Sequence, residues 1–315
     1  MHAAVPLLAL LLAGGGCGES QPPAGPGGST EALRALESIE RLLDAGRTEE
    51  ALRAAEACAR SRPNDALAVE MLGRARMAAH APAADIADAY ARAADLRPDS
   101  PGLQSAAGIT AMQAGRVEAA ITRLTRAAEL EPGNAQHALQ RSLALRAAAR
   151  WSESRAAAER AVSLAPLEPS AHLALAQALL GAGDASEAAA ATRAALACKP
   201  SDRTLRFEVA RTLIACDQGD AAVEIIVATA REPSATPAEI ETLARALEAA
   251  RQPARAAEQW ERLASDPTAP WRPCLQAARC HASAGDTARA KEWISRARER
   301  GAPPAEVERT QPAVR

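Results

Sequence analysis

Seven prolines recur along the chain at a nearly constant interval, and this spacing constrains the fold more than any other feature. The intervals are 35, 34, 34, 34, 33 and 34 residues, and the positions are Pro63, Pro98, Pro132, Pro166, Pro200, Pro233 and Pro267. Proline ends a helix because it lacks a backbone N–H and its ring clashes with the preceding turn. Helix ends at a fixed interval indicate a tandem repeat whose units stack on one another.

Glycines mark a second helix end inside each period. Gly46, Gly115, Gly183 and Gly285 are separated by 69, 68 and 102 residues, which are close to multiples of 34. Glycine readily takes up the left-handed backbone conformation that closes a helix. One stop signal of each kind in a period predicts two helices per repeat.

The composition favours thin layers of closely packed helices over a thick globular core. Apolar residues make up 48% of the chain, yet aromatic residues make up only 2%. Alanine dominates the apolar set, and it is the best helix former because it loses no side-chain entropy. The net charge of −2 arises from 37 basic and 39 acidic residues. Without a basic tail or cluster, this balance gives no indication of nucleic-acid binding.

The period divides the chain into eight units of about 34 residues. They are expected at residues 32–65, 66–100, 101–134, 135–168, 169–202, 203–236, 237–270 and 271–304. Small residues recur at the eighth, twentieth and twenty-seventh positions of a unit, as in Gly108, Ala120 and Ala127. Small side chains at these positions allow two antiparallel helices to approach closely.

This pattern resembles the tetratricopeptide repeat (TPR) family, whose motif prefers small residues at those positions and proline at the thirty-second. The resemblance covers residues 32–304. It implies an all-α fold, a right-handed superhelical α-solenoid of about eight TPR-like helix–turn–helix repeats. A generic helical bundle is the alternative, but it has no reason to keep one register over six consecutive units. Residues 305–315 are too short for another repeat and are expected to begin a capping helix or to fray.

The first 31 residues are expected to lie outside the repeats. Residues 1–17 contain a short apolar run and then small residues before Cys17, which resembles a bacterial lipoprotein signal peptide. The resemblance implies export to the cell envelope or periplasm and lipidation of Cys17; an ordinary cleaved signal is the alternative. Residues 18–31 are rich in Gly, Pro and Ser, which predicts a flexible tether.

No pattern in the sequence indicates catalysis, a cofactor or a metal site. Gly181 and Gly183 lack the third glycine of a dinucleotide fingerprint and fall in an expected turn. The histidines stand in no metal-binding pattern and are expected on helix surfaces or at helix boundaries, and no CxxC motif occurs. The cysteines after Cys17 are expected to pack as small hydrophobes. We therefore expect a protein that is not an enzyme.

The TPR resemblance implies a concave surface lined by the second, fifth, ninth, twelfth and thirteenth residues of each first helix. In units three to six these positions hold mainly apolar candidates for a partner-binding groove: Ile109, Met112, Leu139, Leu143, Leu173, Leu180, Phe207 and Ile214. The ninth position holds arginine in the last three units, at Arg211, Arg245 and Arg279, and also in unit two, at Arg74. Apolar anchors beside an arginine column predict a protein or peptide partner with an acidic segment.

The alternative is that these leucines pack between adjacent repeats and that the arginines pair with Glu241 and Glu248. The function expected from the groove is that of a protein–protein interaction scaffold or adaptor in the bacterial cell envelope. The alternatives are an assembly factor of a secretion, pilus or envelope complex, and an accessory subunit of an enzyme such as a glycosyltransferase. The sequence does not identify the partner, because a repeat fold fixes a surface and not its ligand.

Overall fold

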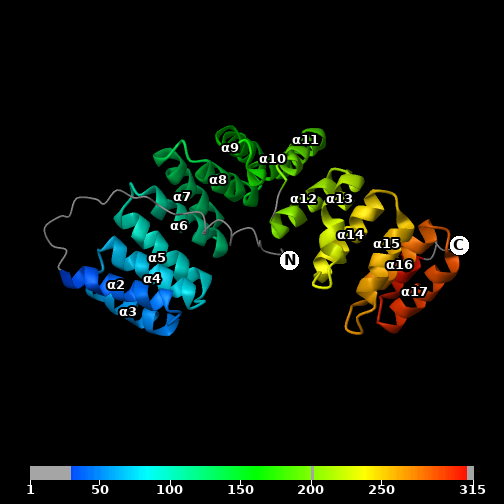
Figure 1. Ribbon diagram of the computed structural model, residues 1–315, viewed down its shortest axis with the longest axis horizontal. Helices are drawn as coiled ribbons and strands as arrows, with labels where there is room; N and C mark the ends of the chain where they lie inside the picture. The colour runs from blue at the N-terminus through cyan, green and yellow to red at the C-terminus, as the bar shows by residue number, and fades with distance from the viewer. Residues whose placement is uncertain (1–29, 200–201, 311–315) are drawn as a thin grey trace. The chain divides into compact units, whose positions relative to one another are not determined.

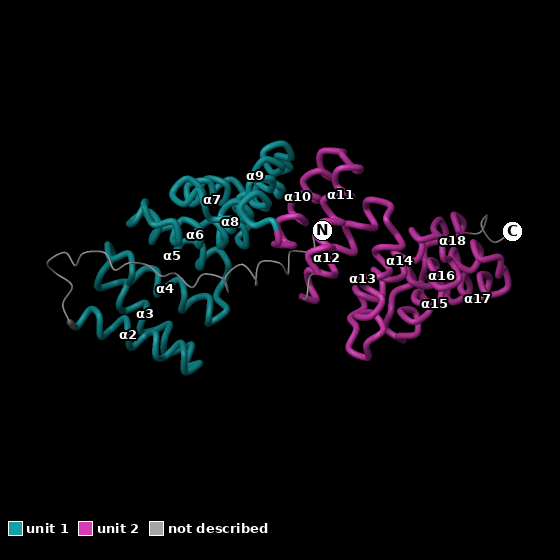
Figure 2. Tube along the Cα trace, turned by 45° about the horizontal axis from the view of Figure 1, so that its top comes forward, with its two compact units in different colours: residues 1–166 teal, residues 167–315 magenta. Residues whose placement is uncertain are grey.

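A computed structural model describes residues 30–199 and 202–310 of the chain, and these residues form seventeen α-helices with no strand (Figure 1). The chain divides into two compact units, Met1–Pro166 and Leu167–Arg315 (Figure 2). Cys17 and most of the predicted tether lie outside the described residues.

The described part of unit 1 contains four helical hairpins. Its helices are α2 (Thr30–Asp44), α3 (Thr48–Ser61), α4 (Ala66–Ala78), α5 (Ala83–Leu96), α6 (Pro101–Gln113), α7 (Val117–Leu130), α8 (Ala135–Ala147) and α9 (Trp151–Leu164). Each even-numbered helix packs on the following odd-numbered helix, and each hairpin packs on the next. We call the even-numbered helices α2 to α16 first helices and their partners second helices.

Unit 2 contains four further hairpins and one short helix. Its helices are α10 (Pro169–Ala182), α11 (Ala185–Ala197), α12 (Arg203–Ala215), α13 (Gly219–Arg231), α14 (Pro237–Ala249), α15 (Pro253–Ala264), α16 (Trp271–Ser283), α17 (Thr287–Glu299) and α18 (Pro304–Thr310). Helix α18 packs on α16 and α17 and buries Val307 in the unit 2 core. The last hairpin is therefore covered by a capping helix, one of the two outcomes expected for this segment.

The recurring prolines act as helix stops. Pro63, Pro98, Pro132, Pro166 and Pro233 each stand two residues after the last residue of a second helix. The first helix that follows then begins at a polar cap. In α4, α6, α8 and α12 the capping side chains of Asp65, Ser100, Asn134 and Asp202 accept hydrogen bonds from backbone amides of the first turn, which satisfies otherwise unpaired donors.

The turn inside every hairpin contains one residue with a left-handed backbone. In four hairpins it is a predicted glycine: Gly46, Gly115, Gly183 or Gly285. In the other four a non-glycine residue has φ between 53° and 57°: His80, Ala149, Asp217 and Arg251. All eight positions follow one another at the repeat interval. Each hairpin therefore has the same left-handed turn, whether the turn residue is glycine or not.

Small side chains allow the paired helices to approach closely. A Cβ atom added to Gly108 would lie 2.5 Å from Cγ of Leu124, and one added to Gly73 would lie 2.9 Å from the Tyr90 ring. Alanines fill the corresponding positions in unit 2, where Ala176, Ala188 and Ala195 are fully buried. These thin layers are the core that the alanine-rich composition predicts.

Candidate partner-binding surface

Within each unit, the first helices are packed more closely on one another than the second helices are. Helix α2 contacts α4 and α6 contacts α8 in unit 1, and α12 contacts both α10 and α14 in unit 2. Among the described residues, no two successive second helices pack to that extent. A layer of hairpins bends towards the side on which its elements are closer together. At these pairs, the first helices therefore lie on the inner side of the bend.

The apolar groove candidates of unit 1 divide into buried and partly exposed residues. Ile109 and Leu139 are each only 4% exposed, and Ile109 belongs to a core cluster with Leu124 and Leu145. Met112 packs against the same cluster, and it retains some exposed surface, as does Leu143. Ile109 and Leu139 thus have the packing role that the sequence left as the alternative.

Two leucines of unit 1 that were not among the predicted groove residues have exposed side chains. Leu33 in α2 is 55% exposed and Leu67 in α4 is 43% exposed. Both occupy the second position of their repeat, so the predicted register was sufficient to find them. Nearby on the same helices, Arg74 donates to Glu40 at 2.9 Å, and both residues occupy the ninth position.

In unit 2, the first helices present a mixed apolar and basic surface. Leu173 is 2% exposed and belongs to the core. Leu180, Phe207 and Ile214 are half-buried, because each packs one side against a buried cluster. Phe207 and Ile214 lie on α12, which also carries Arg211, and each keeps part of its surface exposed.

Three predicted arginines occupy equivalent places on this face. Arg211, Arg245 and Arg279 are the ninth residues of α12, α14 and α16, and all three are exposed. Arg211 pairs with Glu208 at 3.2 Å and lies 5.7 Å from the centroid of the Phe207 ring.

The remaining two arginines differ in their partners. Arg245 pairs with Glu241 at 2.6 Å on its own helix, as the sequence analysis considered. Arg279 forms no hydrogen bond or ion pair with any described residue. Exposed pairs within one helix contribute less than about 1 kcal/mol. A carboxylate of a partner can therefore compete for all three guanidinium groups.

Glu248 does not act as the partner of the arginine column. Its Oε1 accepts hydrogen bonds from Trp260 Nε1 at 2.6 Å and from Cys280 Sγ at 3.1 Å. Burial raises the pKa of the Cys280 thiol, and the adjacent Glu248 carboxylate raises it further. Glu248 is thus committed to contacts between α14, α15 and α16, which leaves Arg279 free of it.

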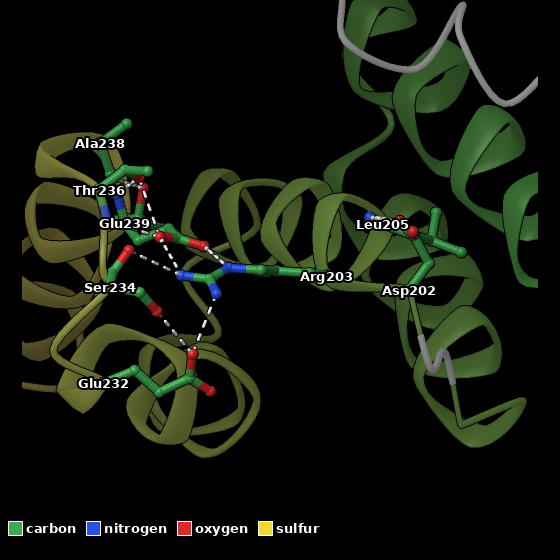
Figure 3. Close-up of polar contacts among 9 residues, drawn as sticks. Asp202, Arg203, Leu205, Glu232, Ser234, Thr236, Ala238 and Glu239 are labelled. Carbon is green, nitrogen blue, oxygen red and sulfur yellow. Dashed lines mark hydrogen bonds and ion pairs between the residues drawn. The ribbon is translucent and has the colours of Figure 1, made fainter.

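An ion-pair network holds α12 against the start of α14 (Figure 3). The guanidinium group of Arg203 donates two hydrogen bonds to Glu239, at 2.6 and 2.8 Å, and one to Glu232 at 3.0 Å. Glu239 also accepts from Thr236 and completes the capping box of α14. The helices that carry Arg211 and Arg245 are therefore joined by a network in which the Glu239 carboxylate is buried.

The prediction that the histidines lie on helix surfaces or at helix boundaries is wrong for two of them. His137 and His281 are both buried, and their Nε2 atoms lie 3.0 Å from Glu131 and 2.7 Å from Glu261. Burial disfavours ionised Glu261, but hydrogen bonds from His281 and Trp293 outweigh it and lower the pKa of that carboxyl. Over the described residues, no group of three His, Cys, Asp or Glu side chains is arranged to hold a metal ion.

The remaining predictions concern cysteines and the membrane. Cys58, Cys216, Cys274 and Cys280 are buried free thiols, and Cys198 is half-buried. All four buried cysteines belong to hydrophobic clusters, as expected, and the Cys280 thiol also donates to Glu248. Among residues 30–199 and 202–310, every helix is too short or too polar to cross a membrane.

Comparisons with known proteins agree with this architecture. The tetratricopeptide repeat family model matches residues 31–101 and 139–203. A MamA fragment from Desulfovibrio magneticus RS-1 is 21% identical with a TM-score of 0.51, and the match covers 56% of this chain and 99% of that one. YrrB, a TPR protein with an unusual peptide-binding site, is 16% identical with a TM-score of 0.50, and the match covers 55% and 89% of the two chains.

A crystal structure of MamA protein gives a similar result, with 20% identity, a TM-score of 0.50 and coverage of 53% of this chain and 91% of the other. Comparison with curated protein sequences finds no match. The helices of the structure, the family model and the similar solved structures together confirm the predicted all-α fold of TPR helix–turn–helix repeats.

Proposed function

We propose that this protein is an interaction scaffold whose first-helix faces bind segments of partner proteins, and that it acts by binding and not by catalysis. The observation that carries the proposal is the exposed column of Arg211, Arg245 and Arg279 in unit 2, beside the half-buried Phe207 and Ile214. Apolar anchors supply most of the binding energy in such a surface, and arginine pairs with carboxylates in a fixed geometry.

The partner segment that fits unit 2 combines an apolar stretch with acidic residues. Its apolar side chains would pack on Phe207 and Ile214, and its carboxylates would replace Glu208 and Glu241 at the arginines. Both existing pairs are local in sequence, and the side chains of Arg211 and Arg245 are 58% and 59% exposed, so solvent or a partner carboxylate can reach each guanidinium group. YrrB, which shares the fold, has a peptide-binding site, and this likeness supports peptide binding as the mode.

Photo-crosslinking from the two faces of unit 2 tests the proposal. A crosslinking residue at the exposed Ala215, on α12, is expected to trap a partner in cells. The same residue at the exposed Glu224, on α13, is the matched control on a second helix. We expect a discrete crosslinked product from Ala215 only, and its loss when Arg211, Arg245 and Arg279 are changed to glutamate. Equal products from both positions would contradict the proposal.

We also propose that the scaffold is exported and anchored to the bacterial envelope by a lipid on Cys17. The apolar run, the small residues before Cys17 and the Gly- and Pro-rich segment after it support this proposal. A tether of that composition gives the repeats freedom to reach partners away from the membrane surface. Mass analysis of the mature N-terminus, with Cys17→Ser as control, is expected to show a lipidated cysteine; an unmodified or uncleaved N-terminus would contradict it.

A further inference from the structure

A small cavity in unit 1 lies where the end of α7 and the start of α8 meet α9. Its volume is about 110 Å³, and its walls include Glu131, Pro132, Asn134, Arg141 and Arg160. A water molecule occupies about 30 Å³ of liquid. The cavity therefore has room for a ligand of a few heavy atoms, and it carries two guanidinium groups.

Arg141 stands at a position where several repeats have a hydrophobic residue. It is the seventh residue of its unit, where three other units have Leu72, Leu175 and Leu243. Its Nε atom is buried and has no hydrogen-bond partner among the described residues. The residue as a whole is partly exposed. A buried polar atom without a partner is costly, so buried polar atoms are normally hydrogen-bonded. Leucine at this position in three other repeats shows that the fold itself does not require an arginine here.

Arg160 brings the second guanidinium group to the same cavity. Its Nη2 donates to the carbonyl oxygen of Pro132 at 3.0 Å, which fixes the side chain against the turn between α7 and α8. The same link occurs two repeats earlier, where Arg92 donates to the carbonyl oxygen of Pro63 at 2.6 Å. The seventh residue of that earlier repeat is Leu72, so that repeat has the equivalent of Arg160 but no equivalent of Arg141.

The acidic residue of the cavity is already engaged elsewhere. Glu131 Oε2 accepts hydrogen bonds from Asn134 Nδ2 and from His137 Nε2, each at 3.0 Å. Neither Arg141 nor Arg160 forms an ion pair with a carboxylate of the described residues. Asn134 is also the N-cap of α8, so the positive end of that helix dipole lies at the cavity and adds to the preference for an anion.

We propose that this cavity is a binding site for a small oxyanion, a phosphate or carboxylate group held between Arg141 and Arg160. Guanidinium groups form charge-assisted, often bidentate hydrogen bonds with both kinds of oxyanion. A bound anion would give both guanidinium groups the charged partner that they lack among the described residues. The site is separate from the first-helix face of unit 2 and does not depend on the function proposed for that face.

Thermal unfolding of the full chain in sodium phosphate, sodium acetate and sodium chloride at equal ionic strength tests the proposal. For the native sequence, we expect a saturable rise in Tm with phosphate, acetate or both, relative to chloride. The Arg141→Leu variant is expected to lose that rise and, in chloride, to unfold at or above the native Tm, because leucine occupies this position in other repeats. A rise with phosphate alone or with acetate alone identifies the anion class.

Two further variants make the result specific. Arg160→Gln leaves α8 unchanged and is expected to reduce the anion-dependent rise in the same way as Arg141→Leu. Arg92→Leu removes the equivalent arginine two repeats earlier and is expected to keep the full rise. No rise in the native chain, or the same rise in the native chain and in Arg141→Leu, would overturn the proposal, since a general salt effect acts on every variant alike.

Discussion

Arg203, the first residue of α12, and Glu239, the third residue of α14, form a bidentate ion pair across 36 positions of sequence. The two hydrogen bonds measure 2.6 and 2.8 Å, and the Glu239 carboxylate is buried while it also caps α14. One carboxylate thus fixes the start of α14 and its place against α12. These two helices carry Arg211 and Arg245, so the pair positions the proposed binding face.

The ion pair predicts a specific dependence of stability on pH. Hydrogen bonds from Arg203 lower the pKa of Glu239 from 4.5 to about 2. A lowered folded-state pKa stabilises the fold above the unfolded value, and this stabilisation is lost as pH falls from 4.5 towards 2. Glu239→Gln is therefore expected to cost about 2–3 kcal/mol at neutral pH, with the difference from the native chain shrinking towards pH 2.

Urea unfolding followed by circular dichroism over this pH range measures the difference. Glu292→Gln is the matched control, because Glu292 pairs with Arg296 at 2.6 Å on the exposed surface of α17. Its cost is expected to stay below about 1 kcal/mol. A loss for Glu239→Gln that equals the control, or that persists unchanged at the acidic end, would contradict the assigned role.

The left-handed turn residues predict a substitution that stabilises the fold. Ala149 has φ 55°, a conformation that costs an L-residue about 1 kcal/mol and glycine nothing comparable. Ala149→Gly is expected to raise the free energy of unfolding by a few tenths to about 1 kcal/mol, because the strain that glycine relieves exceeds the entropy that it adds to the unfolded chain. Gly115→Ala, at φ 73° in the neighbouring repeat, should lower it. Chemical denaturation of both variants checks the opposite signs.

The contact between α13 and α14 predicts that one glycine cannot be replaced. A Cβ atom on Gly219 would lie 2.2 Å from the backbone nitrogen of Ala250 and 2.4 Å from the carbonyl carbon of Ala249. Backbone atoms cannot move aside as a side chain does, so Gly219→Ala is expected to cost about 1–3 kcal/mol or more. Gly133→Ala, which has no atom within 4 Å of the added Cβ, is the control. Similar melting temperatures for the two variants would rule out the close approach.

The sequence predicted the helical hairpins well, because proline and glycine act locally. Pro63 and Pro132 end helices in any context, and Gly46 and Gly115 favour the turn by themselves. His80, Ala149, Asp217 and Arg251 gave no such signal. Their left-handed backbone is imposed by the packing of the hairpins, and packing depends on residues far away in sequence.

The binding face was less predictable, because a repeat register assigns a helix and a position but not the depth of burial. Ile109, Leu139 and Leu173 occupy groove positions, yet neighbouring helices cover them. Leu33 and Leu67 occupy a groove position near the start of the repeats and remain exposed. The division after Pro166 had no counterpart in the sequence pattern, since the period continues through it.

The affinity of unit 2 for a defined acidic peptide decides whether the face that carries Arg211, Arg245 and Arg279 binds an acidic segment. The probe is a fluorescent peptide with an apolar stretch followed by a run of glutamates, compared with a counterpart in which lysines replace the glutamates. Fluorescence anisotropy is expected to show that the native chain binds the acidic peptide more tightly, with an affinity that falls as salt increases.

Changing Arg211, Arg245 and Arg279 together to glutamate is then expected to weaken binding of the acidic peptide by about 10- to 100-fold, with the fold intact by circular dichroism. The matched control changes three exposed arginines of second helices, Arg193, Arg231 and Arg255, and is expected to retain most of the affinity. Equal affinity of the native chain for both peptides, or an unchanged affinity in the Arg211, Arg245 and Arg279 variant, would contradict the claim that this face binds an acidic segment.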